Sequence, residues 1–136
     1  MTSDALSIVA LQANPTVGAV DANITLLRAA RRDAPAGTDL IVASELFISG
    51  YPPEDLVLKP SFQDACAAAV RALAAETADG GPALLIGAPW RAEADQTNSN
   101  PELDNPRIGL RAGALYNAAL LLDDGRIAAL RAKHLL

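Results

Sequence analysis

The sequence predicts an α/β domain built on a mixed β-sheet, and three observations lead to that class. Three short apolar runs, at residues 7–13, 39–47 and 83–88, are each followed by Gly or Pro, which is typical of strands buried on both faces. Segments with apolar residues at helical spacing separate these runs, an alternation that favours parallel strands joined by helices. The pair Asp124-Gly125 then predicts a hairpin, and hence antiparallel strands.

The first unit is a strand, a helix and a second strand. We expect the strands over residues 7–13 and 39–47, joined by a helix that Asp21 caps. Three arginines lie near the end of that helix, where basic side chains complement the helix dipole, and we interpret them as a solvated face: Arg28, Arg31 and Arg32. Two strands joined by one helix favour a parallel arrangement.

The second unit carries a longer helix and a third strand. Residues 52–58 predict a short helical turn, and Ser61 is expected to open the following helix, with an Asp three residues later completing a capping box. Cys66 falls on the apolar stripe of this helix, so we interpret it as a small buried side chain and not as a reactive thiol. The third strand is predicted over residues 83–88, ended by the Pro-Trp pair that follows.

The remainder of the chain is a polar stretch and a hairpin. Residues 91–113 are rich in Asn, Asp and Pro without periodicity. They exceed the ~12–15 residues usual for an unstructured connection, which predicts a mobile insertion loop. A fourth strand is predicted over residues 115–122 and a fifth, antiparallel to it, over residues 127–130. The chain ends on two leucines without a polar tail, so we expect it to be cut within a larger domain.

Composition excludes several classes of protein. The formal net charge is −5 and no basic patch is interleaved with aromatic residues, so nucleic acid is not an expected partner. No apolar run approaches the ~20 residues of a membrane span, and the N-terminus lacks the basic region of a secretory signal. A single cysteine excludes an internal disulfide, and we expect a cytoplasmic protein with no membrane partner.

Few ionisable residues stand where they could carry chemistry. They are Glu45, Glu54, Asp55, Cys66, Lys133 and His134. They form no metal-ligand cluster, and neither a phosphate-binding Gly-rich loop nor a nucleophile elbow occurs, so no metal site is expected. Glu45 is the most informative because it stands at the predicted carboxyl end of a buried strand, where α/β sheets bind ligands. A carboxylate there needs a partner, since burial otherwise raises its pKa.

One segment of the sequence has a recognisable signature. Residues 45–56, ELFISGYPPEDL, resemble the first signature of the glutamine amidotransferase domain of bacterial glutamine-dependent NAD synthetases, in the nitrilase (carbon–nitrogen hydrolase) superfamily. The likeness continues through residues 87–90, 115–121 and 124–125 to Lys133. The PPEDL extension is specific to the synthetases among nitrilase relatives. The resemblance implies that this chain is part of an α-β-β-α sandwich, with a mixed sheet and two main helices on one face.

The resemblance also implies roles for individual residues. In the family a glutamate takes the proton of a cysteine thiol, and a lysine stabilises the oxyanion formed when the thiolate attacks the glutamine amide. These would be Glu45 as general base and Lys133 as oxyanion stabiliser, and we expect a dry pocket to raise the pKa of Glu45 toward neutrality. Tyr51 would line the substrate pocket. The family's nucleophile lies beyond Lys133, so it is absent from this chain, and Cys66 matches no catalytic position.

The whole protein implied by the resemblance is a glutamine-hydrolysing NAD synthase. Residues 1–136 would be the N-terminal portion of its glutaminase domain, which releases ammonia from glutamine for the ATP-dependent amidation of deamido-NAD to NAD. This portion implies no cofactor of its own, because ATP and Mg²⁺ would belong to the synthetase domain, which is absent here. We expect the fragment to be inactive alone and the full-length protein to be a homo-oligomer.

Other interpretations of the same residues stay open. The chain could belong to a stand-alone nitrilase-type amidase, although PPEDL argues against it, or to a non-catalytic interaction module that pairs with another chain. Glu45 could be a structural ion-pair partner and Lys133 a surface charge. Tyr51 could pack over the Pro pair, and Asn117 is expected to tie backbone groups within the hairpin. The residues alone assign no role to three side chains: Glu54, Asp55 and His134.

Overall fold

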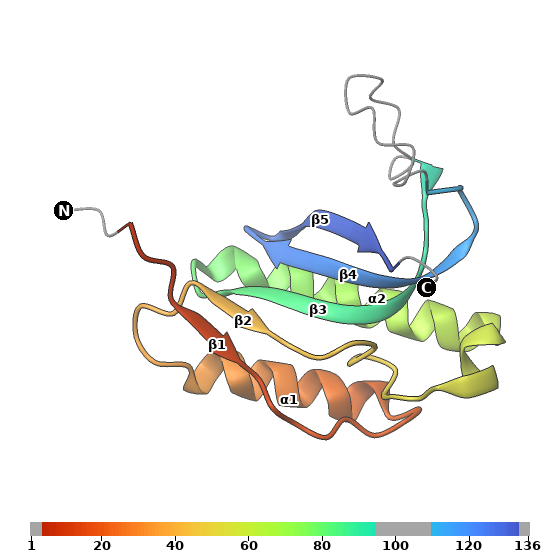
Figure 1. Ribbon diagram of the computed structural model, residues 1–136, viewed down its shortest axis with the longest axis horizontal. Helices are drawn as coiled ribbons and strands as arrows, with labels where there is room; N and C mark the ends of the chain where they lie inside the picture. Colours follow the sequence, from red (N-terminus) through yellow and green to blue (C-terminus); the bar gives the residue numbers. More distant parts are fainter. Residues whose placement is uncertain (1–3, 95–109, 134–136) are drawn as a thin grey trace.

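The sheet of this chain is mixed, as the sequence predicts. The computed structural model describes residues 4–94 and 110–133, and within them five strands lie side by side in chain order (Figure 1). The strands are β1 (Ile8–Ala10), β2 (Leu40–Val42), β3 (Ala83–Arg91), β4 (Leu115–Asp123) and β5 (Arg126–Ala132). The first three are parallel, and β4 is antiparallel to both β3 and β5. The predicted parallel pairing of the first two strands and the predicted hairpin are therefore confirmed.

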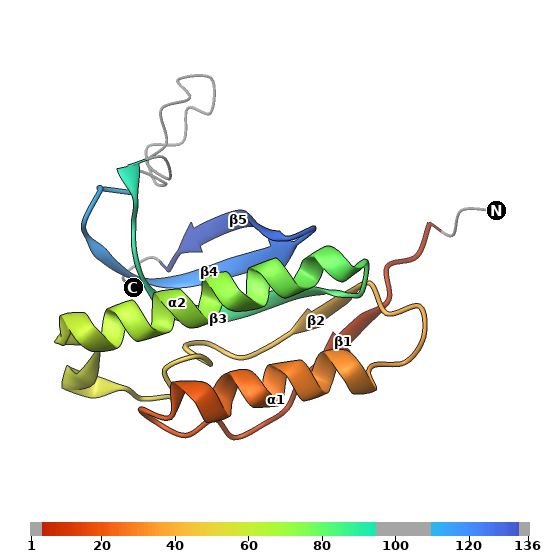
Figure 2. The ribbon, with the colours of Figure 1, turned by 180° about the vertical axis from the view of Figure 1, so that it is seen from behind.

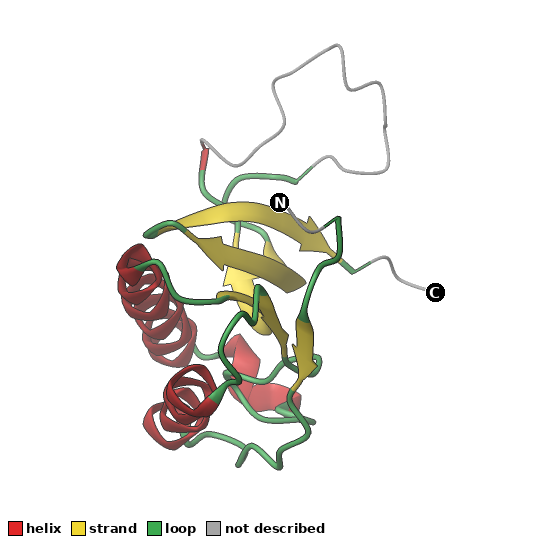
Figure 3. Ribbon diagram, turned by 90° about the vertical axis from the view of Figure 1, so that its left-hand side faces the viewer, coloured by secondary structure: helices red, strands yellow, loops and turns green. Residues whose placement is uncertain are grey.

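Two long helices cover one face of this sheet. They are α1 (Val20–Asp33) and α2 (Pro60–Glu76), accompanied by the short 3₁₀ helices η1 (Glu54–Leu58) and η2 (Thr77–Asp79). Figure 2 shows α1 and α2 in front of the sheet, and Figure 3 shows them edge-on as one layer beside it. The other face of the sheet carries no helix of the described residues (Figure 3). None of the described helices has the length and apolar character that a bilayer crossing requires.

The hydrophobic core lies between the helices and the sheet. Many of its fully buried members come from alternate positions of the strands and from one stripe of each helix, among them Leu27, Ile41, Val70, Leu73, Leu84, Leu120 and Leu122; the turn after β2 adds Phe47 and Ile48. Burying each such side chain contributes roughly 1.5–3 kcal/mol. Cys66 is fully buried in the same cluster, which confirms its predicted place on the core face.

Both long helices begin differently from the sequence prediction. The residue before α1 is Ala19, and no side chain caps the helix, so Asp21 lies in the first turn instead of at the cap. The α2 helix begins at Pro60, because a proline at the first helical position needs no hydrogen-bond donor and has a suitable φ. Ser61 is therefore already inside the helix and caps nothing.

Strand β3 is longer than predicted and continues through the Pro-Trp pair to Arg91. On one side β3 pairs with β2 only as far as Leu85. On the other side it pairs with β4 from Leu84 to Arg91. Pro89 therefore has a neighbouring strand on one side only. A proline, which lacks an N–H group, is tolerated at such a position. Of the predicted loop over residues 91–113, positions 95–109 lie outside the described residues.

Two of the three arginines of α1, Arg28 and Arg32, are exposed as predicted, but Arg31 is not. The side chain of Arg31 is only 9% exposed. It donates hydrogen bonds to the Asp79 carboxylate at 2.8 and 3.1 Å and to the Pro82 carbonyl at 3.0 Å. Arg28 pairs with Glu76 at 2.6 Å. These contacts fasten the end of α1 to the end of α2 and to the segment that leads into β3.

We expect the Asp79–Arg31 contact to make stability depend on pH. The Arg31 guanidinium and the Gly81 N–H group lower the pKa of Asp79 to about 2. A carboxyl whose pKa is lowered by folding stabilises the fold above its unfolded pKa, and this contribution is lost as the pH falls toward 2. Asp79→Asn should therefore lower the urea midpoint of unfolding near pH 7, and the difference from the wild type should vanish near pH 2.

A matched control is Asp33→Asn. Asp33 pairs with Arg32, its neighbour in the chain, and both side chains are largely exposed, so this contact joins no distant elements and its loss should change the midpoint less. A difference between Asp79→Asn and the wild type that stays constant from neutral to acidic pH would show that the charge of Asp79 contributes nothing.

Candidate functional site

A turn directly after β2 presents Glu45. The strand ends at Val42, five residues before its predicted end, and residues 45–49 form a turn in which Leu46 has a positive φ of 51°. Glu45 therefore stands just beyond the carboxyl end of a parallel strand. That is where the sequence places it and where open α/β sheets bind ligands.

Gly87 of β3 lets this turn pack directly against the sheet. The N–H group of Ile48 donates to the Gly87 carbonyl at 3.1 Å. A Cβ atom at position 87 would lie 2.8 Å from the Ser44 carbonyl oxygen and 2.9 Å from the Glu45 carbonyl carbon, and would also collide with the Leu46 nitrogen. Because these are backbone atoms, only glycine fits at this position without moving the turn.

Asn23 of α1 holds the same turn from the helix side. Its side chain is fully buried and donates to the carbonyls of Thr16 at 2.9 Å and Ile48 at 3.0 Å, while its oxygen accepts the Thr16 N–H group at 2.8 Å. A buried amide with three partners is satisfied and rigid. The backbone that carries Glu45 is thus fixed both by the helix layer and by the sheet.

A β-bulge in the hairpin determines which way Lys133 points. Leu122 pairs with Ile127, but Leu121 pairs with Ala129, so Ala128 is an extra residue on β5. A shift of one residue reverses the face of every later side chain. The bulge therefore places Lys133 on the open face of the sheet, opposite Asn117, and the Lys133 N–H group donates to the Asn117 carbonyl at 2.8 Å.

Lys133 and Asn117 converge on one oxygen of Glu45. The Lys133 Nζ atom lies 2.6 Å from Glu45 Oε1, and Asn117 Nδ2 donates to the same oxygen at 2.5 Å. The predicted meeting of Glu45 and Lys133, 88 positions apart in the chain, is therefore seen in the structure. We expected the Asn117 side chain to tie backbone groups within the hairpin. Instead it donates to the Glu45 carboxylate.

The charges of this pair support each other. Hydrogen bonds from Lys133 and then from Asn117 hold the pKa of Glu45 below its ordinary value. The Glu45 carboxylate raises the pKa of Lys133 above its ordinary value. The Glu45 side chain is 41% exposed and the Lys133 side chain is 53% exposed. The expectation that a dry pocket raises the pKa of Glu45 is wrong in this part of the protein, because the site is open and two donors stabilise the charged form.

The pair stands at the rim of a hollow on the open sheet face. The hollow has a volume of about 390 Å³ and a mainly apolar wall that includes Val42, Leu85 and Ala119, with Glu45 and Lys133 among its lining residues. Apolar walls with a few converging polar groups are typical of small-molecule sites. The arrangement combines a carboxylate that can accept a proton with an ammonium that can bind an oxyanion.

Cys66 has no access to this site. It is buried between α2 and the sheet, whereas the hollow opens on the opposite sheet face. Burial raises the pKa of its thiol to about 11. Since the thiolate is the nucleophilic form, Cys66 is unsuited to attack a substrate, and the prediction that it is an inert core residue agrees with its placement.

We expect Cys66 to resist alkylation in the folded chain. A pKa two units above that of an ordinary thiol lowers the thiolate fraction near neutral pH about a hundredfold, and burial adds a steric barrier. Iodoacetamide labelling followed by mass spectrometry should therefore be at least ~10²-fold slower for the folded chain than for the chain unfolded in urea. Equal rates in the two states would contradict the buried placement.

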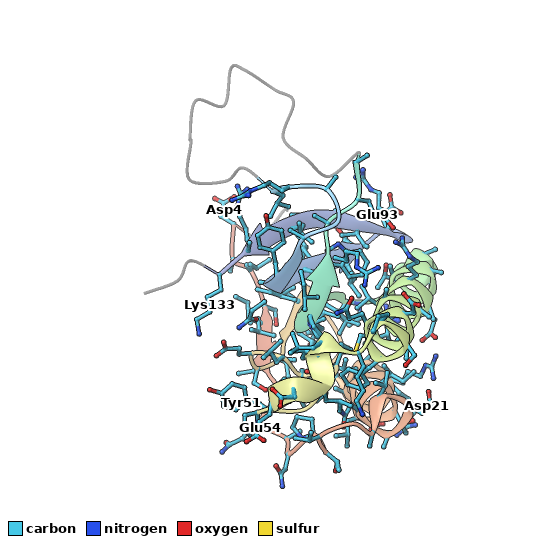
Figure 4. All side chains as sticks on the ribbon, turned by 90° about the vertical axis from the view of Figure 1, so that its right-hand side faces the viewer. Asp4, Asp21, Tyr51, Glu54, Glu93 and Lys133 are labelled. Carbon is cyan, nitrogen blue, oxygen red and sulfur yellow. The ribbon has the colours of Figure 1, made fainter. Side chains whose placement is uncertain are left out.

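The remaining candidates stand apart from the Glu45–Lys133 contact. Tyr51 is 62% exposed and lies outside the lining of the hollow. Figure 4 shows it on the same side of the molecule as Lys133. Glu54 and Asp55 are exposed on η1. His134 lies outside the described residues, and the part of the chain that is described holds no cluster suited to a metal ion.

Relatives of known type match almost the whole chain. The carbon–nitrogen hydrolase family matches residues 6–136. A glutamine-dependent NAD(+) synthetase of Rhodobacter capsulatus is 42% identical over 133 residues, which are 97% of this chain and 20% of the synthetase. The chain spans about a fifth of the length of the curated relatives that it matches over most of its own length.

Two solved structures share the fold. A glutamine-dependent NAD(+) synthetase from Cytophaga hutchinsonii superposes with a TM-score of 0.74 at 23% identity, over 96% of this chain and 19% of that one. An amidase from Nesterenkonia sp. superposes with a TM-score of 0.65 at 24% identity, over 96% and 43% of the two chains. These likenesses confirm the predicted nitrilase-type fold, to which residues 4–94 and 110–133 contribute one mixed sheet and one helix layer.

Proposed function

The chain belongs to the carbon–nitrogen hydrolase family, and from this premise we propose that it forms part of the glutaminase domain of a glutamine-dependent NAD synthetase. The observation that carries the proposal is the convergence of Lys133 and Asn117 on Glu45 at the rim of an apolar hollow. The 42% identity to a synthetase favours this assignment over a stand-alone amidase, for which only the fold is shared at 24% identity.

The pair supplies two of the functions that amide hydrolysis through a thioester needs. Glu45 accepts the proton of a cysteine thiol, and the thiolate adds to the side-chain amide carbon of glutamine. The oxyanion formed there is stabilised by Lys133, whose ammonium keeps two N–H donors beyond the one that faces Glu45. Glu45 then returns the proton to the leaving ammonia. Water, deprotonated by Glu45, cleaves the thioester and releases glutamate, and the proton on Glu45 returns to the leaving cysteine sulfur.

The nucleophile comes from outside this sequence in the proposed mechanism. The sequence contains one cysteine, Cys66, and it lies on the wrong face of the sheet. The amidation of deamido-NAD requires ATP and Mg²⁺, and the described residues hold no group of His, Cys, Asp and Glu side chains suited to a metal ion. We assign both the cysteine and the ATP-dependent step to other parts of the synthetase.

Two assays on matched samples test this function. A longer polypeptide that includes the nucleophilic cysteine should release ammonia from glutamine and convert deamido-NAD to NAD in the presence of ATP, while the 136-residue chain alone should release none. Glutamine hydrolysis by the 136-residue chain would show that the nucleophile is misplaced. Release of ammonia from simple aliphatic amides, without release from glutamine, would favour the stand-alone amidase instead.

A further inference from the structure

We propose that Asn117 is a positioning residue for the base of this site: its side-chain amide holds Oε1 of Glu45 and leaves Oε2 available to accept the thiol proton. The role of Asn117 in catalysis rests on the proposed function. That Asn117 orients the Glu45 carboxylate rests only on its contacts in the structure. Asn117 lines the hollow together with Glu45 and Lys133, and in this proposal it acts through Glu45.

Asn117 joins the two charged residues of the site through two different groups. Its side-chain Nδ2 donates to Glu45 Oε1 at 2.5 Å, and its backbone carbonyl accepts the Lys133 N–H group at 2.8 Å. The orientation of the amide follows from its partner, because a carboxylate oxygen accepts hydrogen bonds and must face the NH₂ end. One residue therefore fixes both where Lys133 leaves the hairpin and how the carboxylate of Glu45 is turned.

The lysine alone would hold the carboxylate less well. Lys133 reaches Glu45 by a flexible four-carbon stem that is 53% exposed, and the terminal torsion of a glutamate is broad. Without a second donor, the carboxylate could rotate until both oxygens faced the ammonium. Asn117 instead lies within β4, where it pairs with Pro89 of β3 and its carbonyl accepts a hydrogen bond from the Lys133 N–H group. Its short side chain therefore extends from a backbone that is held on both sides.

Both donors share Oε1 of Glu45. Among the described residues no hydrogen bond reaches Oε2 of Glu45. A general base needs one lone pair directed at the proton that it removes, and its orientation must be set before the substrate arrives. The amide of Asn117 meets this requirement without adding a charge, whereas a carboxylate at position 117 would repel Glu45.

A titration of the chain itself tests the geometry. The carboxyl pKa of Glu45, followed by carbon NMR, should rise in Asn117→Ala because a hydrogen bond that stabilises the charged form is lost. It should rise further in Asn117→Asp, which keeps the shape of the side chain and places a second carboxylate beside the first. Asn14→Ala changes an exposed asparagine that is not among the residues lining the hollow, so it should leave the Glu45 pKa unchanged. An unchanged Glu45 pKa in both Asn117 variants would overturn the proposal.

Kinetics of the longer polypeptide test the catalytic meaning. Asn117→Ala should lower kcat for ammonia release on the order of 10–10²-fold with little change in KM, as is typical when a supporting hydrogen bond is removed. The acid limb of the pH profile should move to higher pH together with the Glu45 pKa. A shifted pKa with unchanged kcat would overturn the role in catalysis. Failure of the wild-type polypeptide to release ammonia would instead refute the proposed function, and the titration would still decide whether Asn117 positions Glu45.

Discussion

Glu45→Gln is expected to lower the rate of ammonia release from glutamine by about 10²–10⁴-fold in the longer polypeptide, because a positioned general base contributes that much. Glutamine keeps an oxygen that Lys133 and Asn117 can bind, so the geometry of the site should persist while the ability to accept a proton is lost. The acid limb of the wild-type kcat profile, which reports protonation of Glu45, should disappear. Steady-state ammonia release between acidic and neutral pH measures both effects.

The matched control for this change is Glu54→Gln, which makes the same chemical substitution at an exposed position on η1, on the side of the molecule that also carries Tyr51 and Lys133 (Figure 4). It should leave kcat unchanged. The unfolding temperature should be nearly the same in both variants, since exposed ion pairs contribute little to stability. Activity of Glu45→Gln within about threefold of the wild type would exclude Glu45 as the general base.

The sequence predicts the framework of this fold because its signals are local. Apolar runs, helical spacing and the Asp124-Gly125 pair each describe a few neighbouring residues, and the structure contains the strands, helices and turn that they indicate. The predicted ends of elements were less accurate, because they depend on distant partners. The continuation of β3 through Pro89 depends on the point where β2 stops pairing, which no local pattern encodes.

The candidate site was predicted in part. Glu45 was identified by its position after a buried strand, and its contact with Lys133 followed from the family resemblance. If β4 and β5 paired from the Asp124-Gly125 turn onward without a bulge, Ala132 would lie opposite Asn117. Lys133 would then point toward the helices. The bulge at Ala128 corrects this register, and it has no signature in the sequence.

Asn117, Asn23 and Arg31 each have a partner between 25 and 72 positions away in the chain, so local patterns could not assign these contacts. A polar residue in an otherwise apolar strand was the one available signal for Asn117. The same limit applies to the pKa of Glu45, whose direction depends on how many donors the folded chain brings to one oxygen.

Replacing Gly87 with alanine should disrupt the site more completely than any change to a functional side chain except that of Glu45. The added Cβ atom would press on the backbone at Ser44 and Glu45, which cannot move aside as a flexible side chain could. Overpacking of this kind typically costs about 1–3 kcal/mol of stability. A shift of the turn by 1 Å would reduce catalysis about 10²-fold. Urea unfolding of the chain and ammonia release by the longer polypeptide measure the two effects.

The pKa values of Glu45 and Lys133 provide a third and more specific measurement of the effect of Gly87→Ala. If the turn moves, the carboxylate loses Lys133 and Asn117, so the pKa of Glu45 should rise toward its ordinary value and that of Lys133 should fall toward its own. Gly37→Ala is the control, because Gly37 has a φ of +83° with open space around it. That substitution strains the backbone and costs about 1 kcal/mol, yet both pKa values should stay as in the wild type. If Gly87→Ala also left both pKa values unchanged, the close packing of the turn on β3 would not be what holds Glu45 against Lys133.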